Sequence, residues 1–131
     1  MTKDNEQLEH TAFAFKEDLI FNDALSAIEL KSRADKFLSE LTGELRNNGC
    51  KLIGHIKGLI SADGADDVDG AVDKKGHLMF SITSFVEGAH FKGEMSDEIT
   101  KVLFTINVIV FGIDHSAVEG IVERVFSKHF G

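Results

Sequence analysis

The chain has 131 residues and is 43% hydrophobic, which is the length and composition of one ordinary domain with a buried core. No uncharged apolar run reaches the roughly 18 residues that a membrane-spanning helix needs, so we expect no membrane association. The net charge is −8 and the basic residues do not cluster. A nucleic-acid partner is therefore not expected, because a phosphate backbone requires a positive surface.

The N-terminus and the cysteine content bear on location. Residues 1–9 are polar and charged, so we expect them to be frayed at the start of a single domain that spans residues 1–131. They lack the apolar stretch of a secretory signal, and we therefore expect a cytoplasmic protein. Cys50 is the only cysteine, which excludes an internal disulfide and a cysteine-rich zinc or iron–sulfur site within one chain.

The first third of the chain predicts a short strand and a long helix. Phenylalanines alternate with small residues near 11–15, which favours a strand, although the apolar residues at 19–21 are also compatible with the start of a helix. Asn22 or Asp23 can cap a helix, and apolar residues then recur at spacings of three and four. The Asn-Asn-Gly sequence at 47–49 tolerates the left-handed conformation that ends helices.

Residues 51–61 predict a strand that carries glycines at two positions, Gly54 and Gly58. Glycines within a strand indicate a close approach by another backbone, a helix or a ligand. Strict alternation places both glycines on one face. The residues that share this face are Leu52, Ile56 and Ile60. The residues on the other face are Ile53, His55, Lys57 and Leu59.

A hairpin and a final strand–helix unit complete the predicted elements. Residues 62–76 are rich in Asp and Gly and predict a loop. Residues 77–86 and 89–95 predict two strands around a tight turn at Glu87-Gly88. From residue 101 to residue 111 both alternating sets are largely apolar, which is typical of a strand in the middle of a sheet.

Ser116 and Glu119 have the spacing of a capping box, which predicts a C-terminal helix. The order of elements predicts an α+β two-layer sandwich. We expect a mostly antiparallel sheet, with a long N-terminal helix and a C-terminal helix on one face. A ferredoxin-like split unit is the alternative, but it needs a crossover helix between the middle strands that the sequence does not provide.

The strongest candidate site is the run from Gly54 to Gly58. His55 and Lys57 project from the same strand face, so an imidazole and an ammonium together could meet an anion or a metal-bound group. The alternative is a half-exposed edge strand without a ligand. Asn107 is the other candidate, since an amide within an apolar strand either bonds across the sheet or lines a pocket.

A metal site would have to come from histidines. His77, His90 and His115 are available together with His55. A two-residue turn places His90 opposite Phe85 and leaves His77 beyond the returning strand, which works against a metal shared within the hairpin. His55 and His90 remain the candidate metal ligands.

Part of the sequence resembles a known family. A Phe-x-Phe strand at Phe13 and Phe15, a long helix, and a strand with Ile56-Lys57-Gly58 resemble the start of the C-terminal domain of CobW-type metallochaperone GTPases. The segment Ile106–Gly112 is similar to the closing strand of such a domain. The chain has no GTPase domain and no nucleotide motif, so the resemblance implies an accessory module in metal or corrinoid trafficking without GTP hydrolysis.

Three hypotheses about function follow from the sequence. We expect a non-enzymatic module that binds a protein partner or associates with itself as a homodimer, because the apolar strands and the helix provide docking surface. The binding residues that we expect are Gly54, His55, Lys57, Gly58 and Asn107. The alternative is a small-molecule or metal-ion binding protein with His55, His90 and Asn107 in a cleft between sheet and helices. An enzyme is the weakest reading, since no catalytic motif is present, and the sequence identifies no cofactor.

Overall fold

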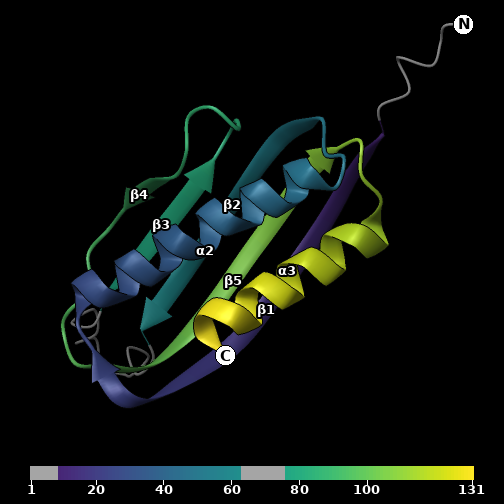
Figure 1. Cartoon of the computed structure of the whole chain (residues 1–131). Coiled ribbons are helices and arrows are strands. Elements are labelled where there is room, and N and C mark those ends of the chain that lie inside the picture. The colour runs from purple at the N-terminus through teal and green to yellow at the C-terminus, as the bar shows by residue number, and fades with distance from the viewer. Residues whose placement is uncertain (1–8, 63–75) are drawn as a thin grey trace, which may run out of the picture.

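A computed structural model describes residues 9–62 and 76–131, and these residues form two layers (Figure 1). One layer is a five-stranded antiparallel sheet, and the other consists of two helices that cover one face of it. In chain order the elements are β1 (His10–Leu25), α2 (Ala27–Asn47), β2 (Leu52–Ala62), β3 (His77–Ile82), β4 (His90–Lys92), β5 (Ile99–Phe111) and α3 (His115–Phe130). The predicted α+β class is confirmed. The expected frayed start and the Asp-rich loop lie almost entirely outside the described residues.

The sheet has the strand order β1-β5-β2-β3-β4. Strand β5 is thus an interior strand, as its two apolar faces predict. Along its helix-facing side, alternate residues from Val102 to Val110 are all buried. None of the described helices is long and apolar enough to cross a membrane.

Strand β1 is much longer than the predicted strand at 11–15, so the long helix is not the N-terminal element. The alternation continues through residues 19–21, where Leu19 is 8% exposed and Ile20 is 74% exposed. Antiparallel pairing with β5 continues without interruption from His10 to Ile20, and this pairing identifies the segment as a strand. Helix α2 then starts after Ser26, whose hydroxyl accepts from Glu29 N–H while the Glu29 carboxylate accepts from Ser26 N–H. This capping box replaces the predicted caps at 22–23.

Strand β2 contains a bulge that changes the predicted faces. The register with β5 shifts between Ile53 and His55, and an extra residue inverts the alternation on one side of a bulge. Ile53 is therefore buried on the helix side, whereas Leu52 is exposed on the opposite side. The prediction that Leu52 shares a face with Ile56 is wrong for this reason.

The hairpin of β3 and β4 also differs from the prediction. Strand β3 ends at Ile82, and His90 pairs with Ser81 instead of Phe85. The connection between Ile82 and His90 is longer than a two-residue turn, and Phe85 within it packs against the hydrophobic core. The guanidinium of Arg46, near the end of α2, lies 4.6 Å from the Phe85 ring centroid and covers it.

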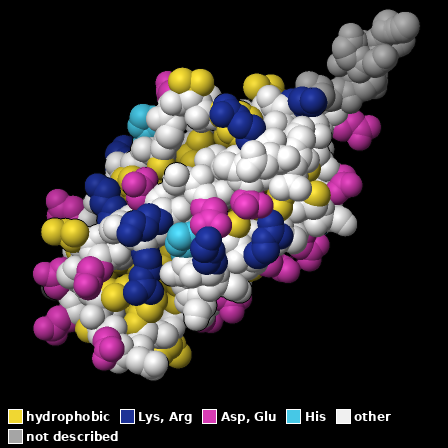
Figure 2. All heavy atoms as spheres, in the orientation of Figure 1, with side chains coloured by type: hydrophobic (Ala, Val, Ile, Leu, Met, Phe, Trp, Pro, Cys, Tyr) yellow, Lys and Arg dark blue, Asp and Glu magenta, His cyan; other side chains and the backbone are white. Residues whose placement is uncertain are grey.

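The C-terminal helix begins slightly earlier than its predicted capping box. Asp114 is the N-cap residue, and its carboxylate accepts a 2.9 Å hydrogen bond from Ala117 N–H. Ser116 therefore lies within the first turn. Acidic and basic side chains intermix over the helix layer (Figure 2). Arg124 bonds to Glu44 at 2.8 Å, which connects α3 to α2.

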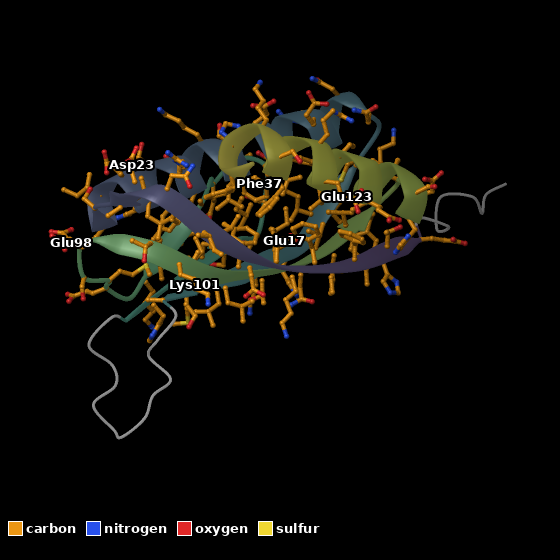
Figure 3. All side chains as sticks on the ribbon, turned by 90° about the horizontal axis from the view of Figure 1, so that it is seen from below. Glu17, Asp23, Phe37, Glu98, Lys101 and Glu123 are labelled. Atoms are coloured by element: carbon orange, nitrogen blue, oxygen red, sulfur yellow. The ribbon has the colours of Figure 1, made fainter. Side chains whose placement is uncertain are left out.

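The core lies between the sheet and the helices and consists mainly of Leu, Ile and Val, with a cluster of phenylalanine rings among them. Phe37 of α2 and Phe104 of β5 have ring centroids 5.5 Å apart, and Phe126 of α3 lies 5.0 Å from Phe104. Figure 3 shows Phe37 between the two layers. No described residue that is buried is polar or charged, which suits phenylalanine, because this side chain fills space without needing a hydrogen-bond partner.

Candidate functional site

The candidate site residues lie on the sheet face that the helices leave uncovered, which we call the outer face. Side chains alternate between the two faces of a strand, so the residues between the buried ones project outward, below the sheet in the edge view of Figure 3. The outer-face residues of β1 and β5 are His10, Ala12, Ala14, Lys16, Asp18 and Ile20, with Lys101, Leu103, Thr105, Asn107, Ile109 and Phe111. Those of β2, β3 and β4 are Leu52, His55, Lys57, Leu59 and Ser61, with His77, Met79, Ser81, His90 and Lys92.

One row of paired residues crosses all five strands. Its members, in sheet order, are Ala14, Asn107, Lys57, Ser81 and His90. The register therefore brings three predicted site residues, Asn107, Lys57 and His90, into line. His55 occupies the neighbouring row of β2, opposite Ile109, so the prediction that His55 and Lys57 share a face is confirmed.

Two shallow hollows meet at Lys57. The larger, of about 440 Å³, lies over β2, β3 and β4, and its polar side chains come from Lys57, Ser81, His90 and Lys92. The smaller, of about 290 Å³, lies over β1, β5 and β2 and includes His55, Lys57 and Asn107. Asn107 is exposed and lines a surface hollow, which is the second of the two alternatives that the sequence left open.

The two glycines of β2 are explained by the packing and pairing of the strand. A side chain at Gly58 would project toward the core, where the Phe80 ring and the Thr105 carbonyl oxygen leave no room for a Cβ atom. The predicted close approach is therefore found at Gly58, and its cause is packing. Gly54 lies at the bulge, where the register with β5 shifts.

The structure does not gather the histidines into a metal site. His55 and His90 are two strands and two residues apart, or about 12 Å between Cα atoms for ordinary sheet spacings. Both imidazoles could reach one ion only by lying flat along the sheet, since Zn–N bonds are about 2.0–2.1 Å. His115 lies on α3 and packs against Phe13, with ring centroids 5.5 Å apart. Among residues 9–62 and 76–131, no group of three or more His, Cys, Asp or Glu side chains is placed to hold a metal.

The predicted cleft between sheet and helices is not the location of the polar candidates. His55, His90 and Asn107 project from the outer face, whereas the space between the layers is filled by the hydrophobic core. The cleft version of the small-molecule alternative is wrong because these strand positions alternate with the buried ones. A ligand would instead have to bind in the open hollows of the outer face.

The outer face is basic although the chain is acidic. Apart from the histidines, its charged residues are four basic ones, Lys16, Lys57, Lys92 and Lys101, and one acidic one, Asp18. The net charge of the whole chain is −8. Among residues 9–62 and 76–131, Asp18 is the acidic residue on the outward positions of these strands. A surface of this kind attracts anionic groups and repels a second basic surface.

The outer face also carries exposed apolar side chains. Ile20 is 74% exposed, Leu52 is 52% exposed and Met79 is 39% exposed. Two more aliphatic residues, Leu103 and Ile109, are half-buried among them. Apolar side chains framed by lysines are typical of a surface that binds another macromolecule.

Groups with shifted pKa values lie away from this face. Burial raises the pKa of the Cys50 thiol. Hydrogen bonds from His129 and Lys128 lower the pKa of Glu40, which lies on α2 and receives these bonds from α3 at 2.9 Å and 3.0 Å. Both effects have structural causes, and neither group belongs to the outer face.

Sequence reasoning missed Ser81 and Lys92, which complete the larger hollow. The alternation within residues 77–82 would have placed Ser81 outward. Its partner could not be found because the length of the connection to β4 was unknown. Lys92 carried no signal of its own, since a lysine in a short strand is commonly solvent-exposed.

No protein-family model and no curated protein matches the chain. The solved structures that are similar to it include two of YjiA GTPase. The Zn(II)-bound YjiA GTPase from E. coli is 12% identical, with a TM-score of 0.40, and the match covers 95% of this chain and 32% of that one. A Zn(II)-bound triple mutant of YjiA GTPase is 15% identical, with a TM-score of 0.41, and the match covers 92% of this chain and 30% of that one.

This chain spans about a third of the length of those proteins. At such identities and TM-scores, the similarity says nothing about nucleotide or metal chemistry in this chain.

Proposed function

We propose that the chain is a non-enzymatic binding module whose outer face docks an acidic, partly apolar surface of a protein partner. The observation that carries this proposal is the separation of charge. Four lysines and one aspartate face outward from the strands, although the whole chain has a net charge of −8. Such an arrangement favours an acidic partner, because complementary potentials steer association and exclude wrong partners.

The shape of the outer face supports a protein partner over a small molecule. The hollows at Lys57 are open at the surface and lie side by side along one row of the sheet. Small-molecule sites usually bury most of the ligand in a concave pocket. A broad face with exposed Leu52 and Met79 suits an extended contact, in which the apolar side chains lose water and the lysines pair with carboxylates.

Charge reversal at the centre of the face tests the proposal. The probe is a labelled peptide of alternating Glu and Leu, whose binding is followed by fluorescence anisotropy. Lys57→Glu should weaken binding at least tenfold at about 0.1 M salt, since Lys57 borders both hollows. Lys36→Glu, on an exposed position of α2, makes the same change in net charge and should alter the affinity about twofold or less.

The two variants separate a local site from net charge. Equal loss of affinity in both would show that total charge governs binding and would overturn the assignment to the outer face. Absence of peptide binding by the unaltered protein would count against an acidic partner altogether.

We further propose, from the sequence resemblance, that the partner belongs to metal or corrinoid trafficking and that the chain catalyses no reaction. Elemental analysis of the purified, tag-free protein tests this assignment. Near-stoichiometric zinc, cobalt or nickel that is lost in His55→Ala would make the outer face a metal site instead of a docking face. Metal-free protein that still binds the acidic peptide supports the docking module.

A further inference from the structure

Strand β1 forms one edge of the sheet and pairs, among the described residues, with β5 alone. Its register with β5 is regular from His10 to Ile20, so this segment presents a long row of backbone groups at the edge. Unpaired groups of this kind are a template for another strand. At the opposite edge, β4 has only the residues His90–Lys92 and offers little to pair with.

The hydrogen bonding shows which β1 residues face the open edge. Gly112 N–H donates to the Glu9 carbonyl at 3.4 Å, so Glu9 points its carbonyl toward the end of β5. Direction alternates along a strand, and therefore the odd-numbered residues of β1 bond to β5. The even-numbered residues, among them Lys16 and Asp18, direct their N–H and C=O groups to the open edge.

The sequence of β1 is nearly symmetric about Glu17. Reading outward from this residue, Lys16 and Asp18 have opposite charges, while Phe15 and Leu19 are both apolar. An antiparallel copy of the same strand, centred on Glu17, would thus meet residues of complementary kind. Phe13 and Phe21 continue the symmetry.

We propose that a second copy of this chain pairs antiparallel with β1, with Lys16 opposite Asp18 of the second copy and Ala14 opposite Ile20 of the second copy. Two-fold symmetry forms each of these pairs twice. All four residues direct their backbone N–H and C=O groups to the open edge of β1, so each pair exchanges two backbone hydrogen bonds. The outer faces of the two copies then lie on the same side of one continuous sheet.

The charges of Lys16 and Asp18 favour this register over the neighbouring registers. A slip by one residue would place outer-face residues opposite helix-side residues, which the pleat does not allow. The next symmetric registers on either side centre on Lys16 or on Asp18, and each places that residue opposite its own copy. Like charges directly opposite each other destabilise strand pairing, whereas opposite charges stabilise it. In the proposed register only Glu17 meets a like charge.

Charge exchange between the two positions tests the pairing. Sedimentation velocity should show the unaltered protein dimerising, and Lys16→Asp or Asp18→Lys alone should weaken the dimer at least tenfold, because each places like charges opposite each other twice. The double variant, Lys16→Asp with Asp18→Lys, should dimerise within about threefold of the unaltered protein. Lys57→Glu, on the outer face away from β1, should leave the dimer unchanged.

Mixing the two single variants makes the test specific for the register. A chain with aspartate at both positions and a chain with lysine at both positions should each stay monomeric, yet the mixture should form a heterodimer, since every opposed pair is then Asp with Lys. Circular dichroism confirms that both variants are folded. A monomeric unaltered protein at about 200 μM, or a mixture that stays monomeric, would overturn the proposal.

Discussion

Replacement of Gly58 by alanine is the most direct test of how β2 is packed. A Cβ atom built at Gly58 lies closer than 3.0 Å to the Phe80 ring and to the Thr105 carbonyl oxygen, which real Cβ atoms essentially never show. The ring can rotate away, but the carbonyl belongs to the neighbouring strand β5 and cannot move without disturbing the sheet. Overpacking a core costs about 1–3 kcal/mol, and the fixed carbonyl places Gly58→Ala in the upper half of that range, at about 2–3 kcal/mol.

Urea denaturation measures this loss. With a slope of about 2 kcal/mol/M, the unfolding midpoint of Gly58→Ala should fall by about 1–1.5 M without a change in slope. Phe80→Leu should partly rescue the variant, because it removes one of the two obstacles, so the double mutant should be more stable than the two single losses predict. A loss below about 0.5 kcal/mol would refute this account, as would additive losses in the double mutant.

Gly54→Ala is the matched control in the same strand. Its Cβ atom would lie 3.0 Å from the Ile109 carbonyl oxygen and 3.1 Å from Ile109 Cγ2. These neighbours need to yield by only a few tenths of an ångström. We expect a loss below about 1 kcal/mol, so the two glycines should differ clearly although the sequence presents them alike.

Three further outcomes are expected. Gly43→Ala, at an exposed position of α2 with nothing within 4 Å of a new Cβ atom, should raise the free energy of unfolding by about 0.8–1 kcal/mol in urea titrations. Ser26→Ala should cost about 1 kcal/mol through loss of the helix cap, while Asn22→Ala should cost less than about 0.5 kcal/mol. Glu40→Gln should be less stable than the unaltered protein at pH 7 and should converge with it as the pH falls below the folded-state pKa of Glu40. The lowered pKa of Glu40 means that its contribution is present above its ordinary value of 4.5 and is lost as pH falls through the folded-state pKa.

The features that the sequence predicts well are those set by periodicity. Two apolar faces placed residues 101–111 inside the sheet, and β5 has two neighbouring strands. Alternation placed His55 and Lys57 on one face, which the register confirms. A side-chain period of two or of 3.6 residues is a property of one segment, so it can be recognised without knowing which segment pairs with it.

The features that the sequence misses depend on pairing. The bulge before His55 exchanges the faces of Leu52 and Ile53, and only the register with β5 reveals it. His90 pairs with Ser81 because the connection between the strands is longer than the two-residue turn that the sequence suggests. The secondary-structure propensity of residues 19–21 is compatible with a strand or a helix, and the long antiparallel pairing with β5 stabilises the strand. The composition of the candidate site could not be predicted for the same reason. Its row of paired residues crosses five strands, and the register between two strands cannot be predicted from either strand alone.

The apolar content of β5 links the fold to the proposed docking. Helices cover only one side of the strand, where residues such as Val108 are fully buried. On the other side Leu103, Ile109 and Phe111 remain half-buried, although an antiparallel sheet with one solvated face normally alternates apolar with polar residues. The surplus of apolar side chains on the uncovered side is not needed to hold the two layers together. A surface that is apolar beyond the needs of the fold, and basic in an acidic chain, has the character that the proposed docking to a protein partner requires.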